Sequence, residues 1–222
     1  MLTAQEIAQL RQEYSQQVLR EADMAADPMQ QFALWFKQAV AAEVPQPNAM
    51  TLATATPTGL PAARIVLLNG VDAQGFIFYT HYLSRKGQEL SANPHAALVF
   101  LWQALERQVR IEGTVERVTA ELSDTYFQSR PLGSQLGAWV SPQSQVIANR
   151  EVLEARLQAV SQQYADRPVP RPPDWGGFRV CPHTIEFWQG RPNRLHDRLR
   201  YRLSSPPMLH SPLTWHLDRL AP

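Results

Sequence analysis

The sequence predicts a mainly β protein with flanking helices (α+β), in which the strands form a small antiparallel barrel. Three observations predict this fold class. Five short apolar or alternating runs follow one another between about residues 50 and 118. Pairs that end in Gly and favour turns separate several of them. Helical spacing lies mostly before and after this region. Because most strands follow one another without a helix between them, consecutive hairpins are favoured over a doubly wound parallel sheet.

Two helices are predicted near the N-terminus, over about residues 3–42. The first begins with the T-x-x-E capping box of Thr3 and Glu6. Its apolar face consists of Ile7, Leu10, Tyr14 and Val18. The second helix begins at Asp27-Pro28, because Asp is a good N-cap and Pro suits the first helical position. Its apolar face consists of Phe32, Trp35, Phe36 and Ala39.

The predicted strands have the sequences MTLATA, ARIVLL, FIFYT, AALVFLW and RQVRIEGTVERV. The pairs Thr58-Gly59, Asn69-Gly70 and Gln74-Gly75 mark turns, and Asn-Gly in particular favours positive φ in a tight turn. Only the stretch SRKGQELSA interrupts the strands, and its composition predicts a short helix. The repeated pattern of strand and turn indicates an antiparallel sheet.

The second half of the chain is predicted to be helical near residues 120–130 and again from about 144 to 164. The segment RPVPRPPDWGG then predicts an ordered or semi-rigid crossing loop, because it is rich in Pro and contains a Gly pair. The runs FRVCP, TIEFWQG, RLRYRL and TWHLDRL predict further strands that rejoin the sheet. We expect one domain over residues 1–222, with a C-terminal strand segment from about residue 174.

Composition excludes several classes of protein. The 222 residues are 44% hydrophobic and 18% charged, so the chain can bury a core rather than stay disordered. The net charge of +1 and the scattered arginines do not predict a nucleic-acid surface. The sequence lacks a secretory leader and an apolar run long enough to cross a bilayer, so we expect a cytoplasmic protein. Cys181 is the only cysteine, which excludes an internal disulfide, and no metal site is predicted.

Common catalytic motifs are absent from the sequence. It contains no G-x-S-x-G, H-E-x-x-H, P-loop or dinucleotide-binding G-x-G-x-x-G motif. Arg, Ser, Tyr and Gln residues at predicted strand ends and helix faces are suited to binding phosphates and a polar ring system. Taken alone, this pattern predicts only a site for an anionic ligand.

Longer motifs carry a specific resemblance. They read RIVLL, FYTHYLSRKG, ERQVRIEG, YFQSRPLGSQLGAWVSPQS, WGGFRV, IEFWQGR, RLHDR and DRLAP. In this order, over nearly the whole chain, they resemble the pyridoxamine 5'-phosphate oxidase family. The resemblance implies a split β-barrel FMN-binding fold and a homodimer with FMN at the subunit interface. It also implies oxidation of pyridoxamine or pyridoxine 5'-phosphate to pyridoxal 5'-phosphate, with O2 as acceptor and H2O2 as product.

The resemblance implies a set of FMN-binding residues, some of them from the partner subunit. Adjacent Arg85 and Lys86 can supply a forked donor and a point charge to a phosphate, although outside the motif a solvated pair would be the preferred interpretation. The full set is Arg64, Ile65, Val66, Leu67, Leu68, Asn69, Tyr79, Thr80, Arg85, Lys86, Gln108, Gln143, Ser144, Trp188 and Arg198.

A second set is implied for the substrate, and Arg194 and His196 within it are the candidate catalytic residues. Arg194 is expected nearest the carbon that gives up a hydride, and His196 is expected to orient the substrate. Tyr126 and Arg130 are spaced i, i+4, which would place them on one face of a helix. The full set is Arg11, Tyr14, Asn69, Tyr126, Arg130, Ser134, Arg194 and His196. Arg11 and Tyr14 could equally be packing residues of the first helix.

Asn69 departs from the family motif, which usually has Lys at this position. We therefore expect a raised Michaelis constant or an altered substrate preference, and we expect Asn69→Lys to tighten binding. Two other functions stay open: a sibling split-barrel flavin oxidase acting on another aromatic metabolite, and a non-catalytic carrier or sensor that binds flavin, haem or pyridoxal phosphate. A nucleic-acid binder is a remote third.

Overall fold

The computed structural model describes residues 13–14, 17–204 and 214–222, which form two compact units. Unit 1 contains the described residues of 1–50, 98–111 and 183–222, and unit 2 contains residues 51–97 and 112–182. Each unit is assembled from segments that are distant in the sequence. The expectation of a single domain over the whole chain stays a prediction.

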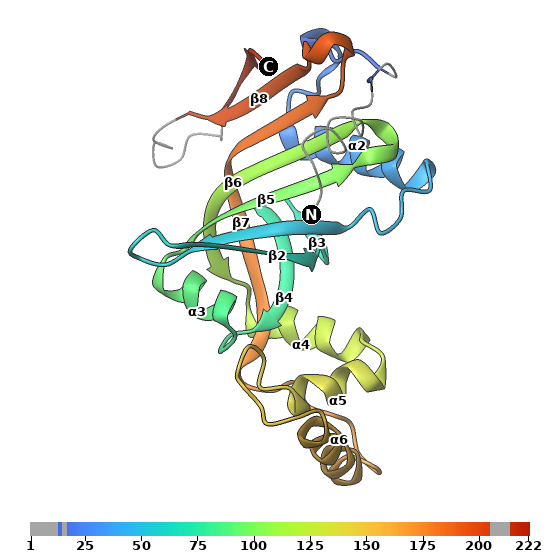
Figure 1. Ribbon diagram of the computed structural model, residues 1–222, viewed down its shortest axis with the longest axis vertical. Coiled ribbons are helices and arrows are strands. Elements are labelled where there is room, and N and C mark those ends of the chain that lie inside the picture. The colour runs from blue at the N-terminus through green and yellow to red at the C-terminus, as the bar shows by residue number, and fades with distance from the viewer. Residues whose placement is uncertain (1–12, 15–16, 205–213) are drawn as a thin grey trace, which may run out of the picture. The chain divides into compact units, whose positions relative to one another are not determined.

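The fold is mainly β with flanking helices, as predicted (Figure 1). The strand order is β2-β1-β5-β6-β7-β4-β3, and β8 pairs with β7 and β9. The described strands are β1 (Ala49–Ala55), β2 (Pro61–Leu67), β3 (Gly70–Asp72), β4 (Gly75–His81), β5 (His95–Trp102), β6 (Arg107–Arg117), β7 (Trp175–Gln189), β8 (Asp197–Leu203) and β9 (Trp215–Leu220). The pairs β3–β4, β4–β7, β7–β8 and β8–β9 are antiparallel.

Five α-helices and three short 3₁₀ turns accompany these strands in the described part of the chain. The helices are α2 (Pro28–Ala41), α3 (Arg85–Ala92), α4 (Ala120–Ser129), α5 (Leu132–Val140) and α6 (Glu151–Gln163). The 3₁₀ turns are η1 (Glu21–Asp23), η2 (Gln103–Leu105) and η3 (Pro192–Arg194). Figure 1 shows α4, α5 and α6 gathered near the first residues of β7.

In unit 1, helix α2 begins as predicted. The Asp27 carboxylate accepts a hydrogen bond of 2.8 Å from the Met29 N–H, and Pro28 occupies the first helical position. The apolar face of the helix is buried, with Phe32 and Trp35 almost inaccessible to solvent. The Trp35 ring packs edge-on against Phe187 of β7 at 5.1 Å between centroids. This contact anchors α2 on the strand that leads to the loop before β8.

The predicted first helix is wrong where the structure describes it. Tyr14 and residues 17–20 are not helical, and the capping box lies outside the described residues. Polar groups here bond to other parts of unit 1 instead of forming a helical ladder. The Leu19 N–H donates to the Asp197 carboxylate at 3.1 Å, and the Arg191 guanidinium donates to the Gln17 carbonyl at 3.2 Å. These long-range bonds replace the predicted local ones.

In unit 2, the turn at Asn69-Gly70 differs from the prediction. Gly59 and Gly75 have φ of 85° and 157°, but neither Asn69 nor Gly70 adopts positive φ. The reason is that Asn69-Gly70 does not close a hairpin between paired strands. Its flanking strands β2 and β3 lie at opposite ends of the strand order, and the Asn69 N–H donates to the Ile77 carbonyl of β4 at 2.9 Å.

Three other secondary-structure elements differ from the prediction. Helix α5 was not predicted, because its sequence LGSQLGAWV contains two glycines, which disfavour helices. The helix predicted from residue 144 begins only at Glu151, since Ser144 has a left-handed φ of 71°. The runs predicted as two strands around Pro182 form one strand, β7, of 15 residues.

Candidate functional site

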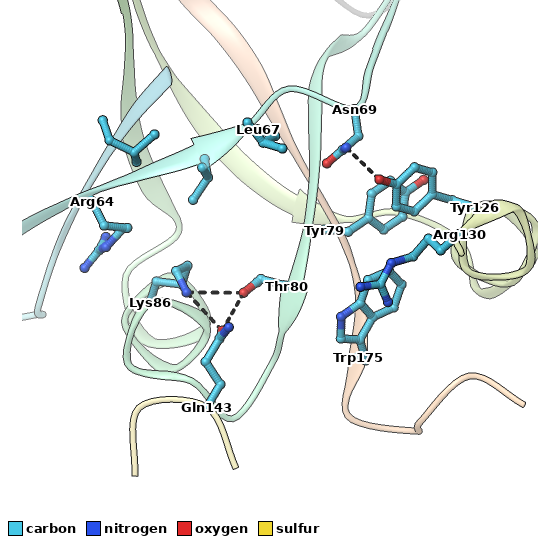
Figure 2. A pocket seen from close by; sticks show the side chains of 12 residues that line it. Arg64, Leu67, Asn69, Tyr79, Thr80, Lys86, Tyr126, Arg130, Gln143 and Trp175 are labelled. Carbon is cyan, nitrogen blue, oxygen red and sulfur yellow. Dashed lines mark hydrogen bonds between the residues drawn. The ribbon is translucent and has the colours of Figure 1, made fainter. Parts of the chain in front are cut away.

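A cavity of about 340 Å³ in unit 2 brings together most of the predicted cofactor and substrate residues of that unit (Figure 2). Its size falls in the usual range for small-molecule sites. The cavity is lined by Arg64, Ile65, Val66, Leu67, Asn69, Tyr79, Thr80, Lys86, Tyr126, Arg130, Gln143 and Trp175. They come from β2, β4, α3, α4, β7 and the loops that follow β2, α4 and α5.

At one side of the cavity, a buried carboxylate holds two arginines. Glu89 of α3 accepts from Arg64 at 3.2 Å and from Arg85 at 2.8 Å. Burial alone would raise the pKa of the Glu89 carboxyl, but hydrogen bonds from Thr54, Arg85 and Arg64 outweigh it and lower that pKa. The ionised carboxylate therefore fixes the direction of the Arg64 guanidinium at the cavity.

Lys86 is a second cation beside Arg64. Its ammonium donates to the Gln143 side-chain oxygen at 3.0 Å and to the Thr80 hydroxyl at 3.3 Å, as the dashed lines in Figure 2 show. Burial and the nearby Arg64 charge lower the pKa of Lys86. Two cations, Arg64 and Lys86, line one cavity and favour binding of an anion there.

The opposite side of the cavity is aromatic. The Tyr79 and Tyr126 rings are stacked with centroids 3.9 Å apart and planes within 9°, and Trp175 lies nearly parallel to both. Gly177 makes room for this stack, because a Cβ there would lie 2.8 Å from Tyr79 Cε1. The Asn69 amide donates to the Tyr126 hydroxyl at 2.7 Å, and burial raises the pKa of Tyr126.

Arg130 lies over this aromatic wall. Its guanidinium carbon is 4.6 Å from the Trp175 ring centroid, and its Nη1 is buried without a hydrogen-bond partner among the described residues. A buried guanidinium nitrogen with no acceptor is costly unless a ligand supplies one. Arg130 is the C-cap of α4 rather than a helical residue, so the expected i, i+4 helix face with Tyr126 is wrong, yet both line the cavity.

The other predicted residues of unit 2 lie outside this cavity. Ser134 lines a neighbouring cavity of about 210 Å³, together with Arg130, Gln143 and Trp175. Leu68 is buried in the core. The Arg85 side chain is 60% exposed and bound to Glu89, and Ser144 is exposed.

In unit 1, Tyr14, Trp188 and His196 form an aromatic cluster. The ring centroids are 4.6 Å apart for Trp188 and His196, and 5.7 and 5.6 Å from Tyr14 to these two rings. Gly190 allows this packing, because a Cβ there would lie 2.7 Å from Tyr14 Cγ. The Arg191 backbone N–H donates to His196 Nδ1 at 3.1 Å. Burial and the Arg194 charge lower the pKa of His196.

The remaining predicted residues of unit 1 differ in their contacts. Arg198 makes a two-pronged ion pair with Glu186, with N–O distances of 2.8 and 3.1 Å. Gln108 is half-buried on β6. Arg194 is exposed, has a left-handed φ of 61°, and its guanidinium has no partner among the described residues. Arg11 lies outside the described residues.

Two neighbours of the site were not predicted as site residues. Glu89 could have been found from the i, i+4 spacing with Arg85, and Trp175 stands in the WGGFRV motif.

Within the described ranges, no group of three or more His, Cys, Asp or Glu side chains could hold a metal ion. The described helices include none long and apolar enough to span a membrane. The paired cations and the aromatic wall are suited to a ligand that combines a phosphate with a planar ring.

Comparison with known proteins gives matches over most of the chain. Residues 36–164 match the family described as pyridoxamine 5'-phosphate oxidase, and residues 175–222 match the pyridoxine 5'-phosphate oxidase C-terminal dimerisation region. The pyridoxine/pyridoxamine 5'-phosphate oxidase of Acaryochloris marina is 59% identical over 99% of this chain and 97% of its own length. The enzyme of the same name from Cyanothece sp. is 60% identical over 97% and 98%.

Two solved structures are similar in fold. PhzG from Burkholderia lata 383, in complex with tetrahydrophenazine-1-carboxylic acid, has a TM-score of 0.84 and 31% identity over 92% of this chain and 98% of its own. A pyridoxamine 5'-phosphate oxidase-related, FMN binding protein from Nostoc punctiforme has a TM-score of 0.69 and 16% identity over 90% and 100%.

Proposed function

The chain belongs to the pyridoxamine 5'-phosphate oxidase family, and from this premise we propose that it is an FMN-dependent oxidase that makes pyridoxal 5'-phosphate from pyridoxamine or pyridoxine 5'-phosphate. It is a flavoprotein oxidase with the split-barrel fold of that family. The observation that carries the proposal is the unit 2 cavity, where Arg64 and Lys86 lie on one side and Tyr126 and Arg130 on the other.

The cationic side of the cavity fits the phosphate of FMN. Arg64, oriented by Glu89, offers a planar fork, and Lys86 offers a point charge. The lowered pKa of Lys86 indicates that its ammonium is poorly solvated there, so an anion would relieve that cost. Thr80 and Gln143 would add neutral hydrogen bonds at the same end.

The aromatic side fits a phosphorylated pyridine ring. The unpartnered Arg130 Nη1 can donate to a phosphate oxygen. The Tyr126 hydroxyl accepts from Asn69 and keeps its own proton to donate. Ser134 lines the adjoining cavity that shares Arg130, and it belongs to the same proposed group. Asn69 would act beside them as a neutral donor.

Bound FMN would supply the redox chemistry, accepting a hydride from the substrate and passing the electrons to O2 to give H2O2. The protein's residues bind and orient the substrate. The unit 2 cavity would hold the phosphates. Arg194 and His196 are proposed, as the family resemblance implies, to contact the reacting part of the substrate. Their orientation of the substrate, rather than a nucleophile or a metal, is what this reaction requires of the protein.

The match of residues 175–222 to a dimerisation region indicates a homodimer. FMN at the subunit interface would follow, with Gln108, Trp188 and Arg198 as further cofactor contacts. A cytoplasmic location is part of the same proposal.

A second function is favoured by one observation. PhzG, at 31% identity and a TM-score of 0.84, was solved with tetrahydrophenazine-1-carboxylic acid, which carries a carboxylate and a fused ring system. The unit 2 cavity, with its cations and aromatic wall, could bind such a ligand instead of a B6 phosphate. The two functions differ in the substrate that reduces the flavin.

Anaerobic mixing of the flavin-loaded protein with pyridoxamine 5'-phosphate, and separately with pyridoxine 5'-phosphate, tests the proposal. Bleaching of the flavin that reverses in air and leaves pyridoxal 5'-phosphate is the expected result. If both compounds leave the flavin oxidised and a reduced phenazine carboxylate bleaches it, the second function holds. If none of them bleaches the flavin, the proposed substrates are wrong, and a different aromatic substrate or a carrier role takes their place.

A further inference from the structure

The loop between β7 and β8 holds His196 in a defined protonation state. The Arg191 backbone N–H points at His196 Nδ1 at 3.1 Å. A ring nitrogen can accept a hydrogen bond only through its lone pair, so Nδ1 carries no proton here. The proton of the neutral ring is then on Nε2, which leaves His196 as a hydrogen-bond donor at that edge.

The surroundings of the ring favour the neutral form. Tyr14 and Trp188 cover it, and burial together with the Arg194 charge lowers the pKa of His196. The nearest carboxylate in sequence, Asp197, already accepts from the Leu19 N–H at 3.1 Å and from Arg219 at 2.8 Å. Its charge is thus balanced by other groups instead of stabilising a protonated His196.

The side chain of Arg191 secures the backbone group that makes this contact. Its guanidinium donates to the Gln17 carbonyl at 3.2 Å and lies 3.4 Å from the Asp197 carboxylate. The loop from Arg191 to Asp197 contains two consecutive residues with left-handed φ, Asn193 at 57° and Arg194 at 61°. Such a backbone persists only where surrounding contacts hold it, and the Arg191 contacts are among those that do.

We propose that Arg191 is a positioning residue that fixes His196 as the neutral ring with its proton on Nε2, so that His196 donates a hydrogen bond to the substrate and takes no proton from it. The acceptor is a lone-pair oxygen or nitrogen of the bound substrate. The identity of that substrate rests on the proposed function, but the state of the ring does not.

Nuclear magnetic resonance of the histidine rings tests the ring state directly. The flavin-loaded full chain is labelled with ¹⁵N, and the signals of His196 are identified by their loss in His196→Gln. The expected result is an unprotonated Nδ1 and a protonated Nε2 at neutral pH. A ring protonated on Nδ1, or one that titrates near the ordinary pKa of about 6.5, would overturn the proposal.

Two isosteric variants test the role of the ring as a donor. In His196→Gln the amide nitrogen would lie about where Nε2 lies in the histidine ring. In His196→Asn the amide nitrogen would lie near the position of Nδ1. We expect His196→Gln to reduce flavin with pyridoxamine 5'-phosphate within about tenfold of the unaltered enzyme, and His196→Asn to be roughly tenfold slower again. If the pH profile of the unaltered enzyme shows an ionisation that both variants lack, His196 acts as a base and the proposal is contradicted.

Arg191 variants test the positioning role. Arg191→Ala keeps the backbone N–H but loses both anchors, so the pKa of His196 should rise toward its ordinary value, and Arg191→Lys should restore part of the effect. Arg202→Ala is the control, because Arg202 of β8 is paired with Asp218 of β9 and not with the loop that holds His196. Unchanged His196 signals in Arg191→Ala would refute the role of Arg191. If the ring state is as proposed but no B6 phosphate bleaches the flavin, only the proposed function fails.

Discussion

The Asn69 side chain donates a hydrogen bond of 2.7 Å to the Tyr126 hydroxyl, which joins the loop after β2 to helix α4 at the aromatic side of the cavity (Figure 2). Tyr126 is at the same time stacked on Tyr79. The tyrosine hydroxyl is therefore fixed by a neutral partner, and Arg130 is the cation that lies on this side of the cavity.

Asn69→Lys should lower the Michaelis constant for both B6 phosphates. Lysine gives up the amide bond to Tyr126 but adds a charge, and hydrogen bonds to charged groups exceed neutral ones by about 1 kcal/mol, or roughly fivefold in affinity. Steady-state kinetics with pyridoxamine 5'-phosphate measure the change. Asn69→Ala is the control, since it loses the amide bond without adding charge and should raise the Michaelis constant. An unchanged or higher value in Asn69→Lys would contradict the prediction.

Local sequence signals were sufficient for the elements that carry their own start and stop residues. Asp27-Pro28 predicted the start of α2, and the alternating runs predicted β1, β2, β4, β5 and β6. The first helix was wrong because groups near Leu19 and Gln17 bond to residues more than 170 positions away, which no local pattern encodes. The strand order is likewise a long-range property, since β2 and β3 are neighbours in sequence but not in the sheet.

The predicted site residues were named from family motifs rather than from physical patterns. Family motifs do not predict that Ser134 lines a neighbouring cavity or that Leu68 is buried in the core, because both depend on tertiary packing. The motifs also omit Glu89, whose carboxylate accepts hydrogen bonds from Arg64 and Arg85. A buried residue that orients ligand-binding side chains has no signature of its own beyond its spacing from Arg85.

Glu89→Gln should weaken flavin binding at neutral pH. The amide keeps the shape of the carboxylate but loses the charge that holds Arg64, so the flavin dissociation constant should rise about tenfold. Fluorescence titration of the flavin-free protein with FMN measures this. Glu154→Gln is a matched control, because Glu154 of α6 pairs with the exposed N-cap residue Arg150, and the change should leave the dissociation constant unchanged.

The same carboxylate should make stability depend on pH. The pKa of Glu89 is lowered in the folded chain, so the ionised group stabilises the fold at pH above its ordinary pKa of 4.5, and the effect is lost as pH falls through the folded pKa. Urea unfolding of the unaltered protein and Glu89→Gln should therefore differ at pH about 7 and converge in acid. A difference that persists or grows at low pH would be inconsistent with this sign.

Arg107→Met should destabilise the fold even though it removes a buried charge. The Arg107 guanidinium donates to the side-chain oxygens of Gln189 at 3.0 Å, Gln38 at 2.5 Å and Gln17, and burial lowers its pKa to about 10. Methionine would fill the space but leave these acceptors without their donor, at a cost of about 2 kcal/mol that exceeds the gain from removing the charge.

Thermal or urea unfolding of the flavin-loaded protein measures this effect. Arg107→Lys should be intermediate, because one ammonium keeps the charge but cannot reach all the oxygens in the planar arrangement of a guanidinium. Equal stability of Arg107→Met and the unaltered protein would mean that desolvation of the charge costs as much as the lost hydrogen bonds.

Arg194 should show that activity and stability are separable in the β7–β8 loop. Its left-handed φ of 61° is disfavoured for any residue with a Cβ, and its exposed guanidinium has no partner in the described part of the chain. Arg194→Ala and Arg194→Gly should both slow anaerobic flavin reduction by about 100-fold, since each removes the proposed substrate contact. The Gly variant should nevertheless be about 1 kcal/mol more stable than the Ala variant, because glycine adopts this φ without strain.

Leu195→Gly is the control, because Leu195 is exposed in the same loop at negative φ and glycine there should not stabilise the fold. If the Ala and Gly variants at position 194 unfold at the same urea concentration, the left-handed backbone is not strained, and the loop holds Arg194 without a cost in stability.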